Sequence, residues 1–310
     1  MRESRFQINV ATGRMTLPVA ILFCLTIWIV SLDSWKDLST MGITALIGYL
    51  MIEANTTFSL IRTRTSLQVG IYWCLFSALV FLHSFEWSCF APLAFLMAVM
   101  HLYRSYESPY ASTSIFHAFF FLAIGSLGFP QLLFFVPLFL FSTFSFRSLS
   151  LKSFFGGLLG IVAPYWILFG YAYWKEDLSL FLAPLQELFR FQSIDYGVFP
   201  LHQWVSWGFI LLLQLVCSIY YFQYSYQDKT RTRIYMSFLV VAGYWGTLIA
   251  LLQPQHLYPI LPIQLICTSF LAAHLFTLTR NRFSGILFIV IFVGFVSLMI
   301  YNLWMQFFSL

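Results

Sequence analysis

Charged side chains are scarce in this chain. Lys, Arg, Asp and Glu together make up 9% of its 310 residues, whereas about 25% is usual in soluble globular domains. Hydrophobic residues account for 60% of the chain, and the mean hydropathy is +0.83. Such a chain lacks the polar surface that a water-soluble fold requires. The composition therefore predicts an integral membrane protein.

Regular alternation of polar and apolar residues is also missing. Long runs such as Phe209–Val216 and Ile286–Val296 are apolar at almost every position. A transmembrane β-barrel would show alternation in each strand of about ten residues. The fold class is therefore predicted to be all-α.

Motifs that hold metals or cofactors are absent. The five cysteines lie in apolar runs without CxxC or Cys/His spacing, so they are predicted to be small buried hydrophobic residues. No HExxH motif accompanies the six histidines. No metal and no cofactor are predicted.

Apolar segments long enough to cross a bilayer recur along the whole chain. A helix of about 20 residues spans a hydrocarbon core of about 30 Å. We therefore predict a polytopic transmembrane helix bundle of about 11 spans (range 10–12), forming a single integral membrane domain over residues 1–310. The predicted spans are Leu17–Leu32, Met41–Leu60, Gln68–Leu82, Trp87–Tyr103, Ser114–Leu127, Phe129–Phe146, Ser153–Trp174, Trp204–Gln223, Ile234–Leu252, His256–Leu278 and Ser284–Phe307.

The distribution of cations predicts the orientation. Thirteen of the 16 Lys and Arg residues fall on the side of the N-terminus, and only Lys36, Lys175 and Arg190 fall on the other side. Basic residues are retained on the cytoplasmic side. The N-terminus is therefore predicted to be cytoplasmic. The basic excess then reflects orientation, so no nucleic-acid partner is predicted.

Residues 175–203 form the longest predicted outer loop. Apolar residues recur at helical spacing from Leu178 to Phe189, with polar residues on the other faces. This pattern predicts an amphipathic segment in the membrane interface, broken by Pro184 into two short pieces. Such a segment can cover a substrate cavity or simply anchor the loop. The loop cations Lys175 and Arg190 are candidate substrate-binding residues.

Acidic residues favour the outer side. Asp33 and Asp37 follow the first span, and Glu86 follows the third. Membrane glycosyltransferases that use polyprenyl-linked sugars often place an acid in the first outer loop, where a carboxylate can take a proton from an acceptor hydroxyl. Here that loop is short, and Asp33 could instead cap the second span. Asp33, Asp37 and Glu86 are the candidate catalytic residues.

Two further groups of polar residues attract attention. Glu53 lies inside an apolar run with Asn55 two residues on. Because a carboxylate in hydrocarbon costs about 2.5 to 3.5 kcal/mol on insertion scales, Glu53 should face the bundle interior, be protonated or have a partner. It is either a proton-coupled site or a structural hydrogen bond.

His202 and His256 lie near the outer face, where with Glu86 they could line one cavity, and both are candidate substrate-binding residues.

The segment from Arg147 to Trp166, RSLSLKSFFGGLLGIVAPYW, combines a basic turn with a glycine-containing span that ends in a Pro-aromatic pair. It resembles a stretch in a family of uncharacterised multi-pass inner-membrane proteins of Bacteroidota. The resemblance implies a location in a bacterial inner membrane and a many-span layout. It implies no catalytic residues.

Three functions agree with these patterns. The first is a cell-envelope glycan transferase or polymerase-like protein that acts on a lipid-linked substrate at the outer face. The second is a proton-coupled transporter or lipid flippase, suggested by Glu53 and by the similar Pro-Gln hairpins at Pro130 and Pro254. The third is a non-catalytic scaffold subunit. The corresponding partners are membrane lipids, a polyprenyl-linked glycan and other envelope proteins.

Overall fold

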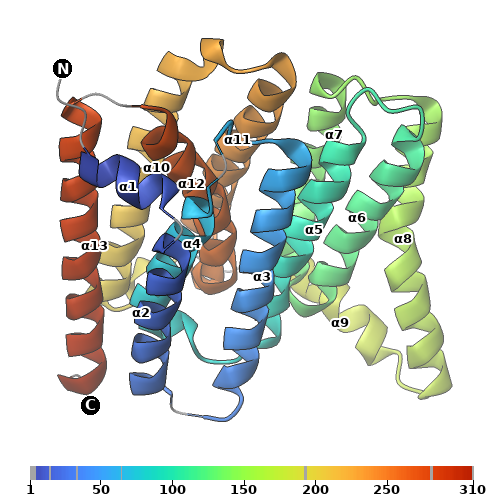
Figure 1. The fold of residues 1–310 in the computed structure, drawn as a ribbon. Helices are drawn as coiled ribbons and strands as arrows, with labels where there is room; N and C mark the ends of the chain where they lie inside the picture. The colour runs from blue at the N-terminus through green and yellow to red at the C-terminus, as the bar shows by residue number, and fades with distance from the viewer. Residues whose placement is uncertain are drawn as a thin grey trace. The chain divides into compact units, whose positions relative to one another are not determined.

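The computed structural model describes residues 5–13, 15–32, 34–63, 65–191, 194–279 and 282–308. Across these residues the protein is helical and contains no strand (Figure 1). The predicted all-α fold class is confirmed. The α-helices are α1 (Arg5–Thr12), α2 (Thr16–Val30), α3 (Asp37–Phe58), α4 (Leu67–Ala78), α5 (Phe90–Arg104), α6 (Ala111–Gly128), α7 (Val136–Ser145), α8 (Leu151–Trp174), α9 (Ser179–Leu188), α10 (Leu201–Tyr224), α11 (Thr230–Leu252), α12 (Leu257–Leu278) and α13 (Arg282–Phe308).

Each of the eleven predicted spans coincides with a helix, although several combine α-helix with a 3-10 turn. The third span ends in the 3-10 turn η1 (Val80–Leu82), and the fourth begins with η2 (Trp87–Cys89). The sixth begins with η3 (Pro130–Phe135), where proline fits the first turn because it has no backbone N–H to pair.

Six of the helical segments in the described residues are long and apolar enough to cross a membrane: Ala111–Gly128, Leu151–Trp174, Leu201–Gln227, Thr230–Leu252, Pro254–Leu278 and Ser284–Gln306. Their outward faces are strongly apolar. Trp166 in α8 is 72% exposed, and Val290 in α13 is 60% exposed. Large contiguous apolar surfaces are unusual in soluble monomers. These helices indicate a membrane protein.

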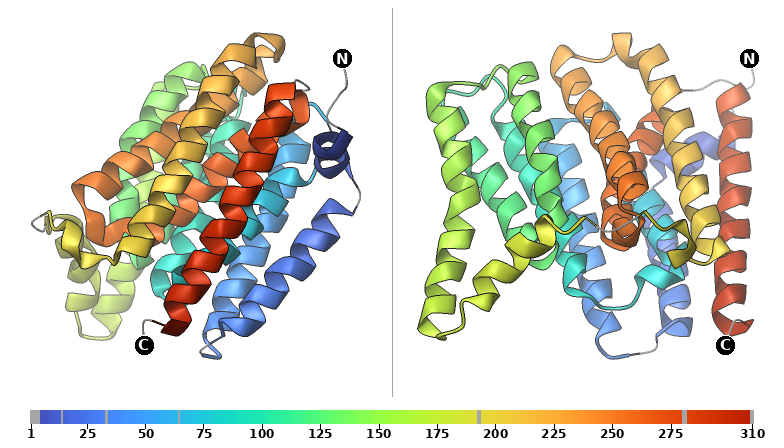
Figure 2. Two further views of the ribbon diagram at one scale, coloured as in Figure 1. Left: turned by 90° about the vertical axis from the view of Figure 1, so that its left-hand side faces the viewer. Right: turned by 180° about the vertical axis from the view of Figure 1, so that it is seen from behind.

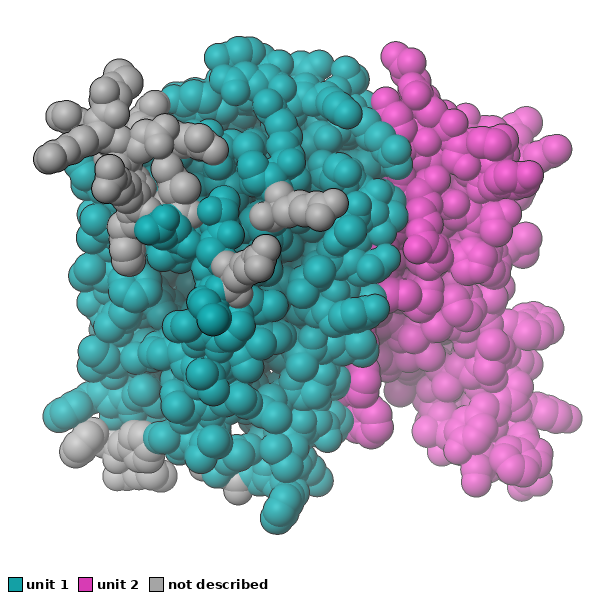
Figure 3. Space-filling model, viewed as in Figure 1, with its two compact units in different colours: residues 1–85, 196–243, 264–310 teal, residues 86–195, 244–263 magenta. Residues whose placement is uncertain are grey.

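The chain divides into two compact units (Figure 3). Unit 1 comprises Met1–Phe85, Tyr196–Gly243 and Gln264–Leu310, and unit 2 comprises Glu86–Asp195 and Tyr244–Ile263. In unit 1, α4 packs against α2, α3 and α13, and α10 packs against α13 (Figure 2). The part of α12 in this unit is buried on every side, as expected for a helix at the core of a bundle.

Unit 2 is organised around α6, which packs against both α5 and α8 (Figures 1 and 2). Glycines on α8 permit the close approach. A Cβ atom on Gly160 would clash with the carbonyl oxygen of Phe116, and one on Gly157 would lie 3.1 Å from the Phe119 ring. Small residues at helix crossings allow backbones to approach closely within membranes.

The amphipathic segment of the long loop forms one helix, α9, which runs obliquely to α8 (Figure 1). The prediction that Pro184 divides it into two pieces is wrong. Proline removes one backbone N–H but keeps a helical φ angle, and here the helix continues through it. The half-buried residues repeat at helical spacing and form the packed face: Phe181, Pro184, Leu185 and Leu188.

Candidate functional site

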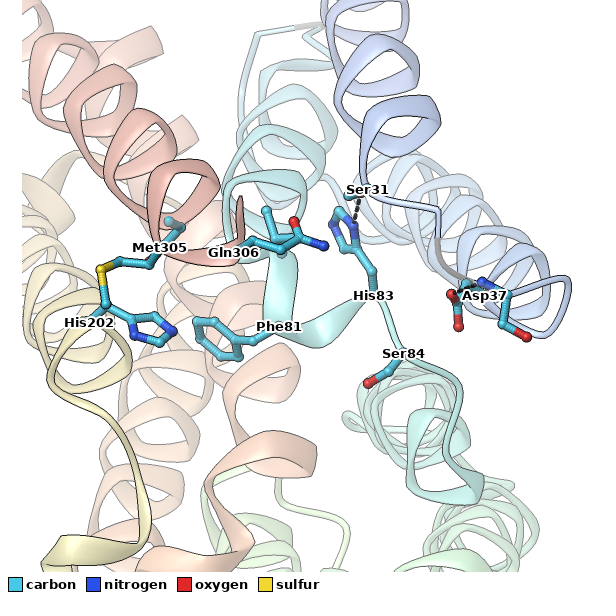
Figure 4. A pocket seen from close by; sticks show the side chains of 11 residues that line it. Ser31, Asp37, Phe81, His83, Ser84, His202, Met305 and Gln306 are labelled. Carbon is cyan, nitrogen blue, oxygen red and sulfur yellow. Dashed lines mark hydrogen bonds between the residues drawn. The ribbon is translucent and has the colours of Figure 1, made fainter. Parts of the chain in front are cut away.

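A cavity of about 360 Å³ lies at one end of the helices of unit 1 (Figure 4). Its walls come from the connection between α2 and α3, the segment around η1, the first turn of α10 and the last turns of α13. Its size falls within the usual range for small-molecule sites, about 300 to 1,000 Å³. The lining residues are Ser31, Ser34, Asp37, Val80, Phe81, His83, Ser84, His202, Asn302, Met305 and Gln306.

His83 is the most completely enclosed titratable residue of this pocket, with 2% of its surface exposed. Its ring stacks on Trp28 with the ring centroids 3.8 Å apart. Nδ1 lies 2.7 Å from the hydroxyl oxygen of Ser31, as the dashed line in Figure 4 shows. Burial lowers the pKa of His83 to about 4, although the backbone of Phe76 and the nearby Asp37 oppose the shift. The imidazole is therefore neutral near pH 7.

Three pocket side chains carry a buried polar atom without a hydrogen-bond partner among the described residues. These atoms are Nε2 of His83, Nδ1 of His202 and Oε1 of Gln306. Buried polar atoms in folded proteins are nearly always hydrogen-bonded, so each exception requires an explanation. Because all three residues line one cavity, a polar group or water bound in that cavity would supply the missing partners.

The wall formed by α13 is fixed by Asn302, which is buried. Its Nδ2 donates to the carbonyl oxygen of Ala78 at 3.0 Å, and its Oδ1 accepts a bond from the hydroxyl of Ser206 at 3.1 Å. One side chain thus joins the ends of α4, α10 and α13. This arrangement gives the pocket a defined shape before any ligand binds.

Asp37 lines the pocket but is engaged in holding the backbone. Its Oδ2 accepts a hydrogen bond from the N–H of Ser34 at 2.9 Å, and its Oδ1 accepts one from the N–H of Phe85 at 3.2 Å. Asp37 thus ties two connections together at the start of α3. Asp33 lies outside the described residues.

The other predicted site residues at the outer face belong to unit 2 and do not line this pocket. Glu86 is exposed and accepts a bond from Ser88 at 3.2 Å. Lys175 is exposed, with its Nζ 5.3 Å from the centre of the Trp174 ring, and Arg190 is exposed. His256 is half-buried, and its ring lies 5.6 Å from that of Phe129. Of the predicted His202, His256 and Glu86, only His202 lines the cavity.

Glu53 does not face the bundle interior, but it has a partner, which is another of the predicted alternatives. Its side chain is exposed on α3, where Oε1 accepts a bond from the Thr57 hydroxyl at 3.1 Å. Asn55 is the buried member of the pair, and its Oδ1 accepts a bond from the N–H of Ile61 at 3.0 Å. Two residues along a helix differ by about 200° in direction, so only one of them can face inward.

A second polar cluster, which the sequence analysis did not single out, lies at the opposite ends of the helices of unit 1. Arg62 Nε donates to Asp228 Oδ1 at 2.7 Å, and His274 Nε2 donates to Asp228 Oδ2 at 2.8 Å. Burial acts to raise the pKa of Asp228, but the hydrogen bonds from His274 and Arg62 outweigh burial and lower that pKa. Asp228 thus fixes the connection between α10 and α11.

The sequence did not lead us to select His83, Asn302 or Gln306 as site residues. The signal available was the spacing of Asn302 and Gln306, four residues apart, which places two amides on one face of an otherwise apolar helix.

No family model, curated protein or solved structure matches this chain.

Proposed function

We propose that the chain is a bacterial inner-membrane protein that acts on a lipid-linked glycan at the outer face, as a glycan transferase or polymerase-like enzyme. In this proposal all eleven helical segments cross the membrane, the N-terminus is cytoplasmic, and the protein belongs to the Bacteroidota family that it resembles. The observation that carries the functional part is the polar pocket of unit 1, whose three unpartnered atoms call for a polar ligand in a largely apolar protein.

The positions of the pocket elements agree with the proposed alternation of the spans. The pocket is built from the end of α2, the start of α3, the residues after α4, the start of α10 and the end of α13. With a cytoplasmic N-terminus and eleven crossings, each of these points lies on the outer side. The gathering of these helix ends in one pocket agrees with alternating spans, whereas the proposed orientation rests on the cation positions alone.

The surface of α9 supports contact with lipid. Leu182 in α9 and the flanking residues Leu178 and Phe189, which lie off the packed face, are 43%, 50% and 73% exposed, respectively. An amphipathic helix with exposed apolar residues can lie in the interface between headgroups and acyl chains. The carboxylate of Asp177 accepts a bond from the N–H of Ser179 at 3.0 Å and caps this helix, so this loop acid has a structural role.

His83 is the best candidate for the general base. When Nδ1–H donates to the Ser31 hydroxyl, and that hydroxyl donates to the carbonyl of Trp28 at 3.4 Å, the lone pair of Nε2 is free to accept a proton. In a glycan transfer, the acceptor oxygen would bond to the anomeric carbon and lose its proton to Nε2, while the polyprenyl phosphate leaves. Asp37 is less suited because both of its oxygens already accept backbone hydrogen bonds.

The transporter hypothesis receives less support. It requires Glu53 to line a cavity, but that side chain is exposed on α3 and does not line the pocket. The scaffold hypothesis predicts that substitutions of pocket residues leave the function in cells unchanged. The complementation experiment below includes this outcome.

Topology is tested by adding single cysteines after replacement of the five native ones. Cysteines at Lys36 and Lys175 should react with a membrane-impermeant maleimide in intact spheroplasts, and those at Arg104 and Lys229 only after permeabilisation. The reverse pattern would overturn the orientation.

Function is tested in the native bacterium by complementing a deletion with His83→Gln and with the control His117→Gln, whose imidazole lies in α6. Membrane amounts are checked by blot. We expect lipid-linked glycans, measured by mass spectrometry, to accumulate several-fold in the deletion and in His83→Gln but not in His117→Gln. Unchanged lipid-linked glycans in the deletion would refute the proposal. Full complementation by His83→Gln would favour a scaffold.

A further inference from the structure

We infer that the pocket of unit 1 binds an uncharged, hydroxyl-rich sugar, held by His83, His202 and Gln306. This inference rests on the proposed function and deepens it, because it states which part of a lipid-linked glycan enters the protein. The charged phosphate that joins the sugar to its lipid would remain outside the pocket.

The charges of the lining exclude an anionic ligand. None of the described lining residues is Lys or Arg, and the one carboxylate, Asp37, would repel an anion. Phosphates and carboxylates are normally held by charge-assisted bonds from Arg or Lys. Without such partners, an anion in this cavity would lose its hydration without compensation.

The charges also disfavour a cation or a metal. Among the described lining residues only Asp37 is acidic, and its two oxygens already accept bonds from Ser34 and Phe85. Among the described residues, no group of three or more His, Cys, Asp or Glu side chains could hold a metal ion. A neutral ligand remains.

The hydrogen-bonding atoms match hydroxyl groups. Gln306 Oε1 can only accept a bond, whereas a neutral imidazole nitrogen donates or accepts according to its tautomer. A hydroxyl group can do both, so neighbouring sugar hydroxyls can satisfy all three unpartnered atoms together. The buried His83, stacked on Trp28, offers Nε2 in a fixed position.

The apolar part of the lining suits the faces of a sugar ring. Phe81 is half-buried in the pocket wall and meets His202 edge to face, with 6.3 Å between the ring centroids. Val80 and Met305 complete this side of the cavity. In Figure 4, Phe81 and His202 lie next to each other. Sugars combine C–H faces with hydroxyl edges, and a cavity with both apolar and polar walls accommodates both.

The test uses the full chain in lipid nanodiscs, with histidine labelled by 15N for NMR. The probes are neutral hexoses and N-acetylhexosamines, compared with glucuronate and inorganic pyrophosphate as charged counterparts. The His83 and His202 signals are identified by their loss in His83→Gln and His202→Gln. The His117 signal serves as an internal control because this residue lies in unit 2.

We expect at least one neutral sugar to shift the His83 and His202 signals and leave that of His117 unchanged. Gln306→Leu should weaken the binding of this sugar at least tenfold, whereas Gln186→Leu on the exposed surface of α9 should not. If only glucuronate or pyrophosphate shifts the two signals, the inference is wrong. It is equally wrong if no probe shifts them, because the pocket then holds only water.

The binding experiment and the measurement of lipid-linked glycans in cells together separate this inference from the proposed function. If a neutral sugar binds the pocket but lipid-linked glycans are unaffected in cells, the protein binds free saccharide and the proposed function fails. If lipid-linked glycans accumulate in the deletion strain but no neutral sugar binds the pocket, the function stands and the inference fails.

Discussion

The hydroxyl oxygen of Ser31 and Nδ1 of His83 lie 2.7 Å apart, although the two residues are separated by 52 positions in the chain. Ser31 follows the last turn of α2, and His83 follows the 3-10 turn η1. Trp28, one turn earlier in α2, stacks on the same imidazole. The end of one helix thus both orients a histidine and shields it from solvent, leaving Nε2 for the pocket.

The Ser31–His83 bond gives a first prediction. Ser31→Ala would leave a buried nitrogen without a partner, which costs about 1 to 3 kcal/mol. The expected result is a lower midpoint of thermal unfolding of the purified protein in detergent, together with a changed 15N tautomer signal of His83. Thr26→Ala is the control, because this exposed residue on α2 bonds only within its own helix. Equal effects of the two substitutions would contradict the assigned role.

Burial of the neutral His83 gives a second prediction. Its pKa is lowered to about 4, against about 6.5 in an unfolded chain. Between these values the unfolded state binds more protons, so stability falls as pH decreases from about 6.5 to about 4. His83→Gln should reduce this pH dependence of the free energy of unfolding, measured by denaturant titration in detergent. His117→Gln is the comparison, and an unchanged pH dependence in His83→Gln would refute the prediction.

The sequence predicted where helices occur better than which way their side chains face. Long apolar runs specify helices because the bilayer requires every backbone group to be paired within the segment. Apolar residues cover most faces of α3, however, so periodicity could not show that Asn55 is buried and Glu53 exposed. Whether a side chain is buried depends on which neighbouring helices pack against its face, and the sequence does not show that packing.

The candidate site was predicted only in part for the same reason. Asp37 and His202 were selected because they lie near the ends of apolar runs, and both line the pocket. Asn302 and Gln306 were overlooked because they lie within the final apolar run. His83 became distinctive only through Ser31 and Trp28, which the fold brings to it from another helix.

The buried ion pair of Asp228 with Arg62 gives a third prediction. Asp228→Asn removes the charge that pairs with Arg62 and that accepts a hydrogen bond from His274, and breaking a buried pair costs about 3 to 5 kcal/mol. Because Arg62 is 44% exposed, we expect a loss near the lower end of this range in chemical unfolding. The control is Glu107→Gln, which breaks the exposed pair with Arg147 and should cost less than about 1 kcal/mol. A comparable loss in both variants would contradict the prediction.

The same aspartate predicts a response to acid. The pKa of Asp228 is lowered in the folded protein, so its stabilising effect is complete above the ordinary aspartate pKa of about 4 and is lost as pH falls below that value. Wild-type protein should therefore lose more stability than Asp228→Asn when pH is lowered from about 5 to about 3. Parallel losses in the two proteins would show that Asp228 does not contribute in this range.

The close packing of α8 on α6 gives the last prediction. A Cβ atom on Gly160 would meet the backbone of Phe116 and lie 3.1 Å from the backbone nitrogen of Phe120. Because backbone atoms cannot change rotamer as a side chain can, Gly160→Ala should force the two helices apart. The free energy of unfolding should fall by about 1 to 3 kcal/mol. Gly170→Ala in the same helix meets nothing within 4 Å and should be neutral or stabilise by up to about 1 kcal/mol. Thermal unfolding of both variants in detergent measures the difference, and a Gly160→Ala protein as stable as wild type would show that the helices separate without loss.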